Sequence, residues 1–275
     1  MAFCNNGTQI AMPDELNSII HICDLNGNLI ESKDPDGIID QPIGICILTK
    51  EDGDEEIYIG DCAEHKVFVF DSNFTLKNTF GDNRLKIPQY ILIDDENVTN
   101  KYLYASDFSN DEITIWNTQD GQFIDYIKVN SPFTIRFDAS HIYAVSPTEF
   151  KLNDENRVEK IEKGGNCIFI IKKIKPYDVV KEIKFDNWLC PSSLHICNEM
   201  KIYTVAYDLD SNGVKSEYKS LFIIDLNGNI CKKIILNDIQ IIGDMLVFQN
   251  KLVFSVRSAI RVLQFENINL STIEN

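Results

Sequence analysis

The sequence predicts an all-β protein, a six-bladed β-propeller in which each blade is a four-stranded antiparallel sheet. Three observations predict this fold. A pattern of short apolar strands and polar turns recurs six times, with a period of about 40–50 residues that is typical of propeller blades. The turns carry the residues that tight hairpins need. Between the strands, no stretch shows the periodicity of a helix, which argues against an α/β fold.

The clearest repeat relates residues 9–24 to residues 56–71, which align without a gap at an offset of 47 positions. Each copy contains an apolar strand, a short polar turn, a second apolar strand and an aspartate that opens the next turn. Three of the turns that follow these second strands contain glycine after Asn or Asp, at Asn26-Gly27, Asp120-Gly121 and Asn227-Gly228. Such pairs supply the positive φ of tight hairpins, so the two outer strands of each blade are predicted as hairpins.

Another two-strand segment precedes most of these hairpins, and a proline often stands just before it, at Pro42, Pro88, Pro132 and Pro191. Each unit therefore has four strands. We expect a single domain over residues 1–275, with blades at approximately 1–33, 42–81, 87–129, 131–185, 189–236 and 238–275. The first unit is short. Either its innermost strand comes from residues 2–4, or the N-terminal residues complete the blade made by the C-terminus.

The second unit resembles an NHL repeat over residues 57–81. The resemblance rests on Asp61 after the second strand, Lys66 before the third strand, and the closing pair Phe80-Gly81. The third unit matches in part, through Asp107 and Trp116. The resemblance covers one repeat closely and the others loosely, so it implies the propeller fold more than a function. Some NHL propellers bind RNA, but they use a positive face for it.

The charge balance bears on the partner. The chain has 42 Asp and Glu against 26 Lys and Arg, a formal net charge of −16. Such a surface repels a phosphate backbone, so we expect no nucleic acid and instead a protein partner, either one with a basic surface or a second copy of the chain. The densest basic strip is Lys172, Lys173, Lys175 and Lys181, which we interpret as a solvated hairpin edge.

Composition also bears on location. The first ten residues are too polar for a signal peptide, and no apolar run approaches the roughly 18 residues of a membrane span. We expect a cytoplasmic or intracellular protein without membrane contact. Abundant isoleucine and asparagine suggest an AT-rich genome, and a component of a viral particle fits that source. The eight cysteines form no C-x-x-C pair and are expected to be reduced, although an even number leaves disulfides open.

Two loops contain oxygen-bearing side chains at alternate positions. Residues 208–213 read D-x-D-x-N-G, with Asp208, Asp210 and Asn212 as potential cation ligands. The twelfth position of an EF-hand loop is Lys219 here, so we interpret the segment as a polar hairpin loop. Residues 107–111 occupy the equivalent loop of the third unit and receive the same interpretation.

The innermost strands, which border the channel of a propeller, are mostly apolar, with Arg136 and His195 as polar exceptions. Asp94, Asp95 and Asp138 follow such strands and are the best-placed carboxylates. Trp188 lies between units and is interpreted as covering the end of a blade. No catalytic, cofactor-binding or metal-binding residues are therefore assigned, and no cofactor is expected. The sequence predicts a non-enzymatic interaction or scaffold module; the alternative is a calcium-dependent hydrolase similar to the lactonase propellers.

Overall fold

The computed structural model describes residues 1–81, 83–94, 101–152, 158–163, 165–185, 188–196, 201–209, 215–236, 244–248, 251–256 and 259–264. These residues form strands and turns, and none of them is helical. The contacts divide the chain into two compact units, residues 1–135 (unit 1) and residues 136–275 (unit 2), which are described separately.

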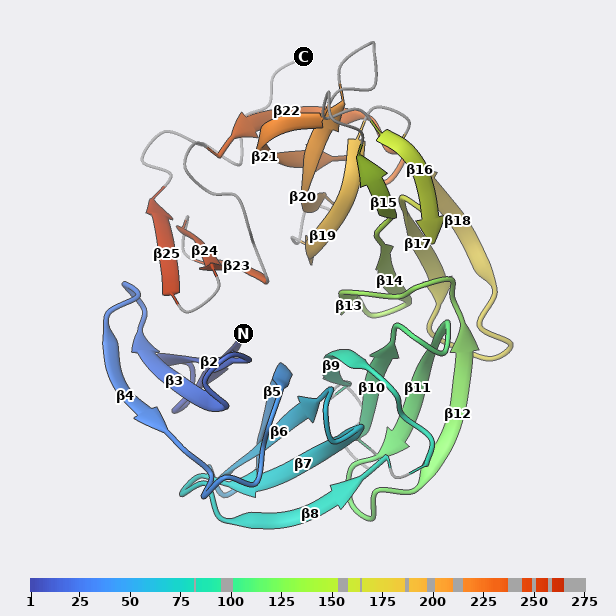
Figure 1. Ribbon diagram of the computed structural model, residues 1–275. Helices are drawn as coiled ribbons and strands as arrows, with labels where there is room; N and C mark the ends of the chain where they lie inside the picture. Colours follow the sequence, from blue (N-terminus) through green and yellow to red (C-terminus); the bar gives the residue numbers. More distant parts are fainter. Residues whose placement is uncertain are drawn as a thin grey trace. The chain divides into compact units, whose positions relative to one another are not determined.

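Unit 1 contains three four-stranded antiparallel sheets, each in chain order (Figure 1). Blade 1 has β1 (Ala2–Cys4), β2 (Gln9–Asp14), β3 (Ile19–Asp24) and β4 (Leu29–Lys33). Blade 2 has β5 (Pro42–Thr49), β6 (Glu55–Asp61), β7 (Lys66–Asp71) and β8 (Leu76–Phe80). Blade 3 has β9 (Pro88–Asp94), β10 (Tyr102–Asp107), β11 (Glu112–Asn117) and β12 (Phe123–Lys128). The innermost strands β1, β5 and β9 are neighbours, so each blade packs on the next.

Unit 2 repeats this arrangement. Blade 4 is formed by β13 (Ile135–Phe137), β14 (His141–Ser146), β17 (Cys167–Lys172) and β18 (Val179–Lys184). Blade 5 has β19 (Trp188–Ile196), β20 (Ile202–Leu209), β21 (Lys215–Ile224) and β22 (Ile230–Ile235). A last sheet has β23 (Met245–Phe248), β24 (Lys251–Val256) and β25 (Ala259–Gln264). Contacts join β14 to β19 and β19 to β23.

The all-β fold of four-stranded antiparallel blades in a propeller arrangement is therefore confirmed. Five of the six predicted blades are four-stranded sheets. The sixth differs from the prediction, because it has three strands within the described residues. A single domain over residues 1–275 stays a prediction.

The start of the chain settles one alternative. β1 pairs with β2 in antiparallel register, with Ala2 opposite Ala11 and Cys4 opposite Gln9. The first blade is thus completed by its own N-terminal strand. The competing picture, in which these residues complete the blade made by the C-terminus, is wrong.

The longer fourth copy has a structural cause. Between β14 and β17 the chain forms an additional hairpin, β15 (Glu149–Leu152) paired with β16 (Val158–Lys163), which makes a separate two-stranded sheet. The apolar rhythm did not separate this insertion from the blade. Pro191 also differs from expectation: it lies inside β19, where the pairing with β20 shifts between Leu189 and Ser193. A shift of this kind accommodates a residue that cannot donate a ladder hydrogen bond.

The aspartate at the end of the second strand of a blade anchors the backbone of neighbouring segments. The Asp61 side chain is fully buried and accepts hydrogen bonds from the backbone N–H groups of Asp40, Gln41, Ala63 and Glu64, over 2.7–3.2 Å. Two of these donors lie in the connection from blade 1 and two in the β6–β7 turn. One buried carboxylate therefore accepts from backbone donors of two segments and fixes where the innermost strand of blade 2 begins.

Asp107 does the same in blade 3. It accepts from the N–H groups of Lys86 and Ile87 at 2.9 and 3.1 Å, and from the Asn110 side chain at 2.7 Å. Residues 107–111 resembled the start of a cation-binding loop. The carboxylate of Asp107 in this loop is instead hydrogen-bonded to donors of the chain itself.

Glycine in the outer turns allows blades to approach each other. Gly121 has φ +69°, and a Cβ there would lie 2.9 Å from Cβ of Phe80, the last residue of β8. Gly228 has φ +88°, and a Cβ there would lie 2.8 Å from Cγ2 of Ile183 in β18. In both units the outer turn of one blade thus packs on the outer strand of the preceding blade, and only glycine combines that φ with that space.

Candidate functional site

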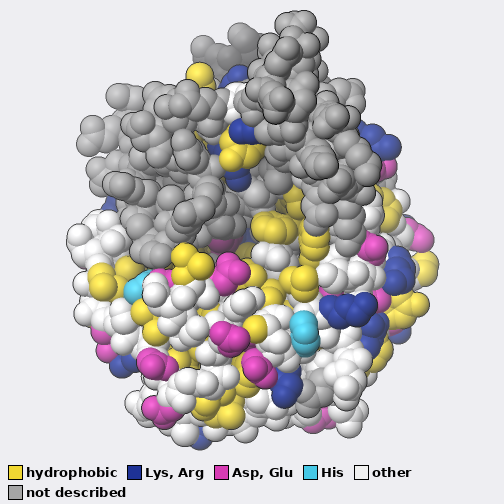
Figure 2. Space-filling model, in the orientation of Figure 1, with side chains coloured by type: hydrophobic (Ala, Val, Ile, Leu, Met, Phe, Trp, Pro, Cys, Tyr) yellow, Lys and Arg dark blue, Asp and Glu magenta, His cyan; other side chains and the backbone are white. Residues whose placement is uncertain are grey.

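The candidate site is a cluster of exposed apolar and basic side chains on blade 3. Phe123, Ile124 and Tyr126 on β12 are 40%, 43% and 44% exposed, large values for such side chains. Arg84, from the connection between β8 and β9, and Lys128, from the end of β12, lie beside them. We call these five residues the blade 3 surface. Figure 2 shows Lys and Arg side chains next to apolar ones at the right-hand edge of the face in view, where Figure 1 places β12.

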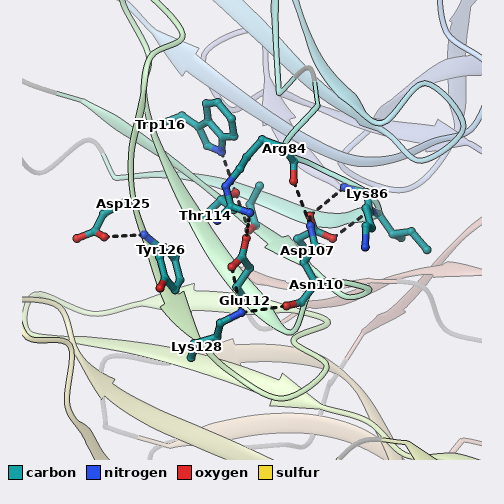
Figure 3. Close-up of polar contacts among 12 residues, drawn as sticks. Arg84, Lys86, Asp107, Asn110, Glu112, Thr114, Trp116, Asp125, Tyr126 and Lys128 are labelled. Carbon is teal, nitrogen blue, oxygen red and sulfur yellow. Dashed lines mark hydrogen bonds and ion pairs between the residues drawn. The ribbon is translucent and has the colours of Figure 1, made fainter.

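A buried carboxylate organises the two cations (Figure 3). Glu112, the first residue of β11, is 3% exposed and forms ion pairs with Arg84 and, at 3.3 Å, with Lys128. The Arg84 carbonyl accepts a hydrogen bond from the Asn110 side chain at 3.1 Å. Because a buried carboxylate requires a compensating charge, Arg84 is fixed in place although a third of its side chain reaches solvent.

The Arg84 guanidinium lies over two rings of β12. Its central carbon is 4.8 Å from the centre of the Phe123 ring and 5.6 Å from that of Tyr126. The Lys128 ammonium lies 5.4 Å from the Tyr126 ring centre. These distances are within the range of cation–π attraction, so the exposed rings are held by the same cations that neutralise Glu112.

Phe123 is also the outer end of a row of aromatic rings. Ring centres are 6.4 Å apart from Tyr58 to Phe80, 5.7 Å from Phe80 to Trp116 and 5.3 Å from Trp116 to Phe123. Tyr58, Phe80 and Trp116 are buried, and the Trp116 N–H donates to the Thr114 hydroxyl at 2.8 Å. The exposed ring is therefore supported by the core of blades 2 and 3 and has little freedom left to lose on binding.

The edge of β12 is partly closed to further strands. The backbone N–H of Tyr126 donates to the side chain of its neighbour Asp125 at 2.9 Å, and in β8 the N–H of Thr79 donates to Asn78 at 2.8 Å. An N–H group occupied in this way is not available to an added strand. Contact through side chains is therefore favoured over strand addition at this edge.

The innermost strands of unit 2 hold a second polar group. Arg136 on β13 donates to the Asp244 carboxylate at 3.1 Å and to the Met245 carbonyl at 3.3 Å. His195 on β19 is close enough to both charges to be affected by them, and its ring packs edge-on to Tyr203 with centres 6.1 Å apart. The sequence identified Arg136 and His195 as exceptions but not Asp244. The arrangement is a buried ion pair beside a histidine.

His195 gives a pH prediction. Burial, together with the nearby Arg136 charge, lowers the pKa of its imidazole to about 4. Because the unfolded chain takes up this proton near pH 6.5, stability falls as pH drops through that value towards 4 and is unaffected above it. Between pH 7 and pH 5 the loss is about 2 kcal/mol. In urea unfolding, the difference in free energy of unfolding between wild type and His195→Gln should be the same at pH 7 and pH 8. At pH 5 the variant should have lost less of this free energy than wild type. Equal losses would contradict the assignment.

The other predicted site residues do not converge. Asp94 is buried at the end of β9, and Asp95, Asp210 and Asn212 lie outside the described residues, as do the side chains of Asp208 and Trp188. Asp138 accepts hydrogen bonds from the Tyr143 hydroxyl at 2.6 Å and from the N–H groups of Ser140 and His141 at 2.7 Å. Burial opposes ionisation there, but these bonds outweigh it and hold the Asp138 pKa below its ordinary value. Within the described residues, no three metal-ligating side chains gather at one place.

The described cysteines are thiols. Cys4, Cys23, Cys46, Cys62 and Cys167 are buried and Cys231 is half-buried, and none of the six is in a disulfide. Burial raises the pKa of Cys4, Cys62 and Cys167 to about 12, so these thiols are protonated and unreactive at neutral pH. They pack as small apolar side chains, as the sequence predicts. Within the described residues, no helix has the length and apolar character to span a membrane.

The sequence matches no protein-family model and no curated protein. The fold is similar to that of solved structures. A chain of hydrazine synthase from Kuenenia stuttgartiensis superimposes with a TM-score of 0.66 at 13% identity, over 100% of this chain and 78% of that one. A chain in a nidogen–laminin complex gives 0.61 at 14% identity, over 93% and 89%. A chain in the complex of BBS1N with ARL6DN gives 0.55 at 12% identity, over 95% and 88%. At these identities the likeness shows the fold alone, and the NHL resemblance stays a prediction.

Proposed function

We propose that the chain is a non-enzymatic protein-interaction module of the NHL-like propeller type, and that the blade 3 surface is a binding site. The observation that supports this most is the pairing of exposed Phe123 and Tyr126 with a fixed arginine. Aromatic residues and arginine are enriched at the centres of protein interfaces, where a few side chains account for most of the affinity. Two of the similar folds come from structures of protein complexes, which is consistent with such a role.

The rigidity of the site supports the same proposal. A binding surface loses affinity when its side chains must be ordered on contact. Here the aromatic row and the Glu112 ion pairs hold the rings and Arg84 before any partner arrives. The Asp125 contact at the edge of β12 favours a partner that packs on side chains, so we expect the affinity to depend on the rings rather than on backbone pairing.

The test is affinity capture followed by reconstitution. Wild type and Phe123→Ser/Tyr126→Ser are immobilised and exposed to an extract of the source cells, and a captured protein is then purified and titrated. We expect at least one protein to bind wild type about a hundredfold more tightly than the variant, because two central aromatic side chains each contribute more than 1 kcal/mol. The matched control is Leu29→Ser/Ile30→Ser, which removes two exposed apolar side chains from β4. If every captured protein binds all three forms equally, the proposal is wrong.

A further inference from the structure

Unit 2 carries a second exposed surface, on the outer strands of blades 4 and 5. It consists of the β17–β18 hairpin over residues 172–184 and the outer turn and strand of blade 5 over residues 225–235, and we call it the unit 2 rim. These two segments contain seven lysines and three carboxylates, a net charge of +4 in a chain whose net charge is −16. The lysines are Lys172, Lys173, Lys175, Lys181, Lys184, Lys232 and Lys233.

The two segments form one surface. The Lys181 ammonium donates to the Asn227 side chain at 3.1 Å, and the turn that holds Asn227 lies against Ile183 at Gly228. β18 and the turn that leads into β22 are thus in direct contact. The lysines of both segments therefore attract the same approaching partner, because salt screens little of the interaction between charges that are closer than the Debye length of about 8 Å.

Exposed aliphatic side chains are interleaved with these lysines. Ile174 in the hairpin turn is 71% exposed, Val179 and Val180 on β18 are 49% and 47% exposed, and Ile230 and Ile235 on β22 are 52% and 60% exposed. Protection of an open sheet edge explains lysines on β18, but it does not explain aliphatic side chains left in water beside them. In blade 1, β4 also exposes Leu29 and Ile30, but carboxylates outnumber cations over residues 24–34.

We propose that the unit 2 rim binds an acidic polypeptide segment that carries aliphatic side chains. The carboxylates of such a segment match the lysine excess, and its aliphatic groups cover the exposed isoleucines and valines. This differs from the basic partner that the net charge of the whole chain suggests, because a partner meets the local charge at contact. The proposal is independent of the blade 3 surface, which belongs to unit 1.

Two other anionic partners fit the rim less well. An RNA strand needs aromatic side chains for base stacking, and no aromatic residue is among the exposed large apolar side chains that this rim has in its described part. An anionic membrane needs apolar groups that project together from one tip. Only Ile174 lies in the hairpin turn, while the other four aliphatic residues lie on the strands β18 and β22.

The test uses the full chain and three probes of stated composition. These are a fluorescent peptide of alternating aspartate and leucine, single-stranded oligouridine, and vesicles that contain phosphatidylserine. We expect only the peptide to bind, with a dissociation constant that rises about tenfold when NaCl is raised from about 50 to about 500 mM. Fluorescence anisotropy measures the first two probes and co-sedimentation the third.

Two double variants separate the rim from general electrostatics. Lys175→Glu/Lys233→Glu, with one exposed lysine from each blade, is expected to weaken peptide binding about tenfold or more, as rim charges in an electrostatic contact do. Lys33→Glu/Lys77→Glu makes the same charge change on β4 and β8 of unit 1 and should alter binding less than about twofold.

A third variant, Ile174→Ser/Val180→Ser, keeps every charge and should weaken binding several-fold, while circular dichroism reports whether the strands are intact. The proposal is overturned if the peptide does not bind at millimolar concentration or if both charge variants lose binding equally. It is also overturned if the vesicles or the RNA bind and the peptide does not. Because the blade 3 surface is untouched in all three variants, their behaviour does not depend on the function proposed for it.

Discussion

Asp61→Ala is expected to lower the free energy of unfolding by about 3–5 kcal/mol, because the variant removes a buried carboxylate that is the acceptor of four part-buried backbone N–H groups. The loss should appear as a lower midpoint in urea titrations followed by tryptophan fluorescence. Trp116 lies in the adjacent blade and reports on the packing between blades 2 and 3. Proteolysis is expected to begin in the connection over residues 34–41, which Asp61 holds at Asp40 and Gln41.

Asp71→Ala is the matched control. Asp71 opens the outer turn of the same blade and accepts from the N–H groups of Asn73 and Thr75, both at 2.9 Å, but these groups are exposed to solvent. Water replaces the lost acceptor there, so the expected cost is about 1 kcal/mol. If Asp61→Ala costs no more than Asp71→Ala, then Asp61 does not organise the connection between blades 1 and 2.

These two aspartates show how far the sequence predicts the fold. Both recur with the repeat, and both mark turns, so the blades and their strand order follow from local pattern. The difference between their contributions to stability does not follow from the sequence, because Asp61 gains two of its donors from a segment about 20 residues earlier in the chain. The sequence shows that the position recurs, and only the fold shows that its carboxylate accepts from the connection between blades 1 and 2 as well as from its own turn.

The candidate site was less predictable for the same reason. Arg84, Glu112 and Phe123 belong to a connection, the start of one strand and the start of another, and no spacing rule brings them together. Phe123 alone looks like one more strand aromatic. Phe123 is exposed because β12 is the outermost strand of blade 3, at the edge where the sheet ends. The signal available in the sequence was the apolar pair Phe123-Ile124 directly after a polar turn.

The insertion β15–β16 and the shift at Pro191 escaped prediction because apolar alternation is the same inside and outside a blade. Asp244 was not predicted as part of a polar group, because it precedes a short apolar strand and has no motif around it. Its importance depends on Arg136, which is 108 positions away in the sequence. Pairing at this distance is set by how blades follow one another and not by local propensity.

The second large effect is expected at Arg84. Arg84→Met keeps most of the side-chain volume but removes a charge from a carboxylate that is 97% buried, since Glu112 is only 3% exposed. We expect a loss of about 2–4 kcal/mol in the free energy of unfolding, because a buried charge that loses one partner keeps its desolvation cost. Lys128→Met should cost less than about 0.5 kcal/mol, since that lysine is 65% exposed and its ion pair is 3.3 Å long.

A double-mutant cycle tests the cause. If the cost of Arg84→Met comes from the uncompensated carboxylate, then Arg84→Met/Glu112→Gln should recover at least about 1 kcal/mol relative to the sum of the single changes. Additive losses would contradict the ion pair as the source of the effect. The double variant also separates stability from binding, because it removes the uncompensated carboxylate and leaves a folded blade without the guanidinium over Phe123 and Tyr126. A partner of the blade 3 surface should therefore still dissociate faster from this variant than from wild type, although both are equally folded at 25 °C.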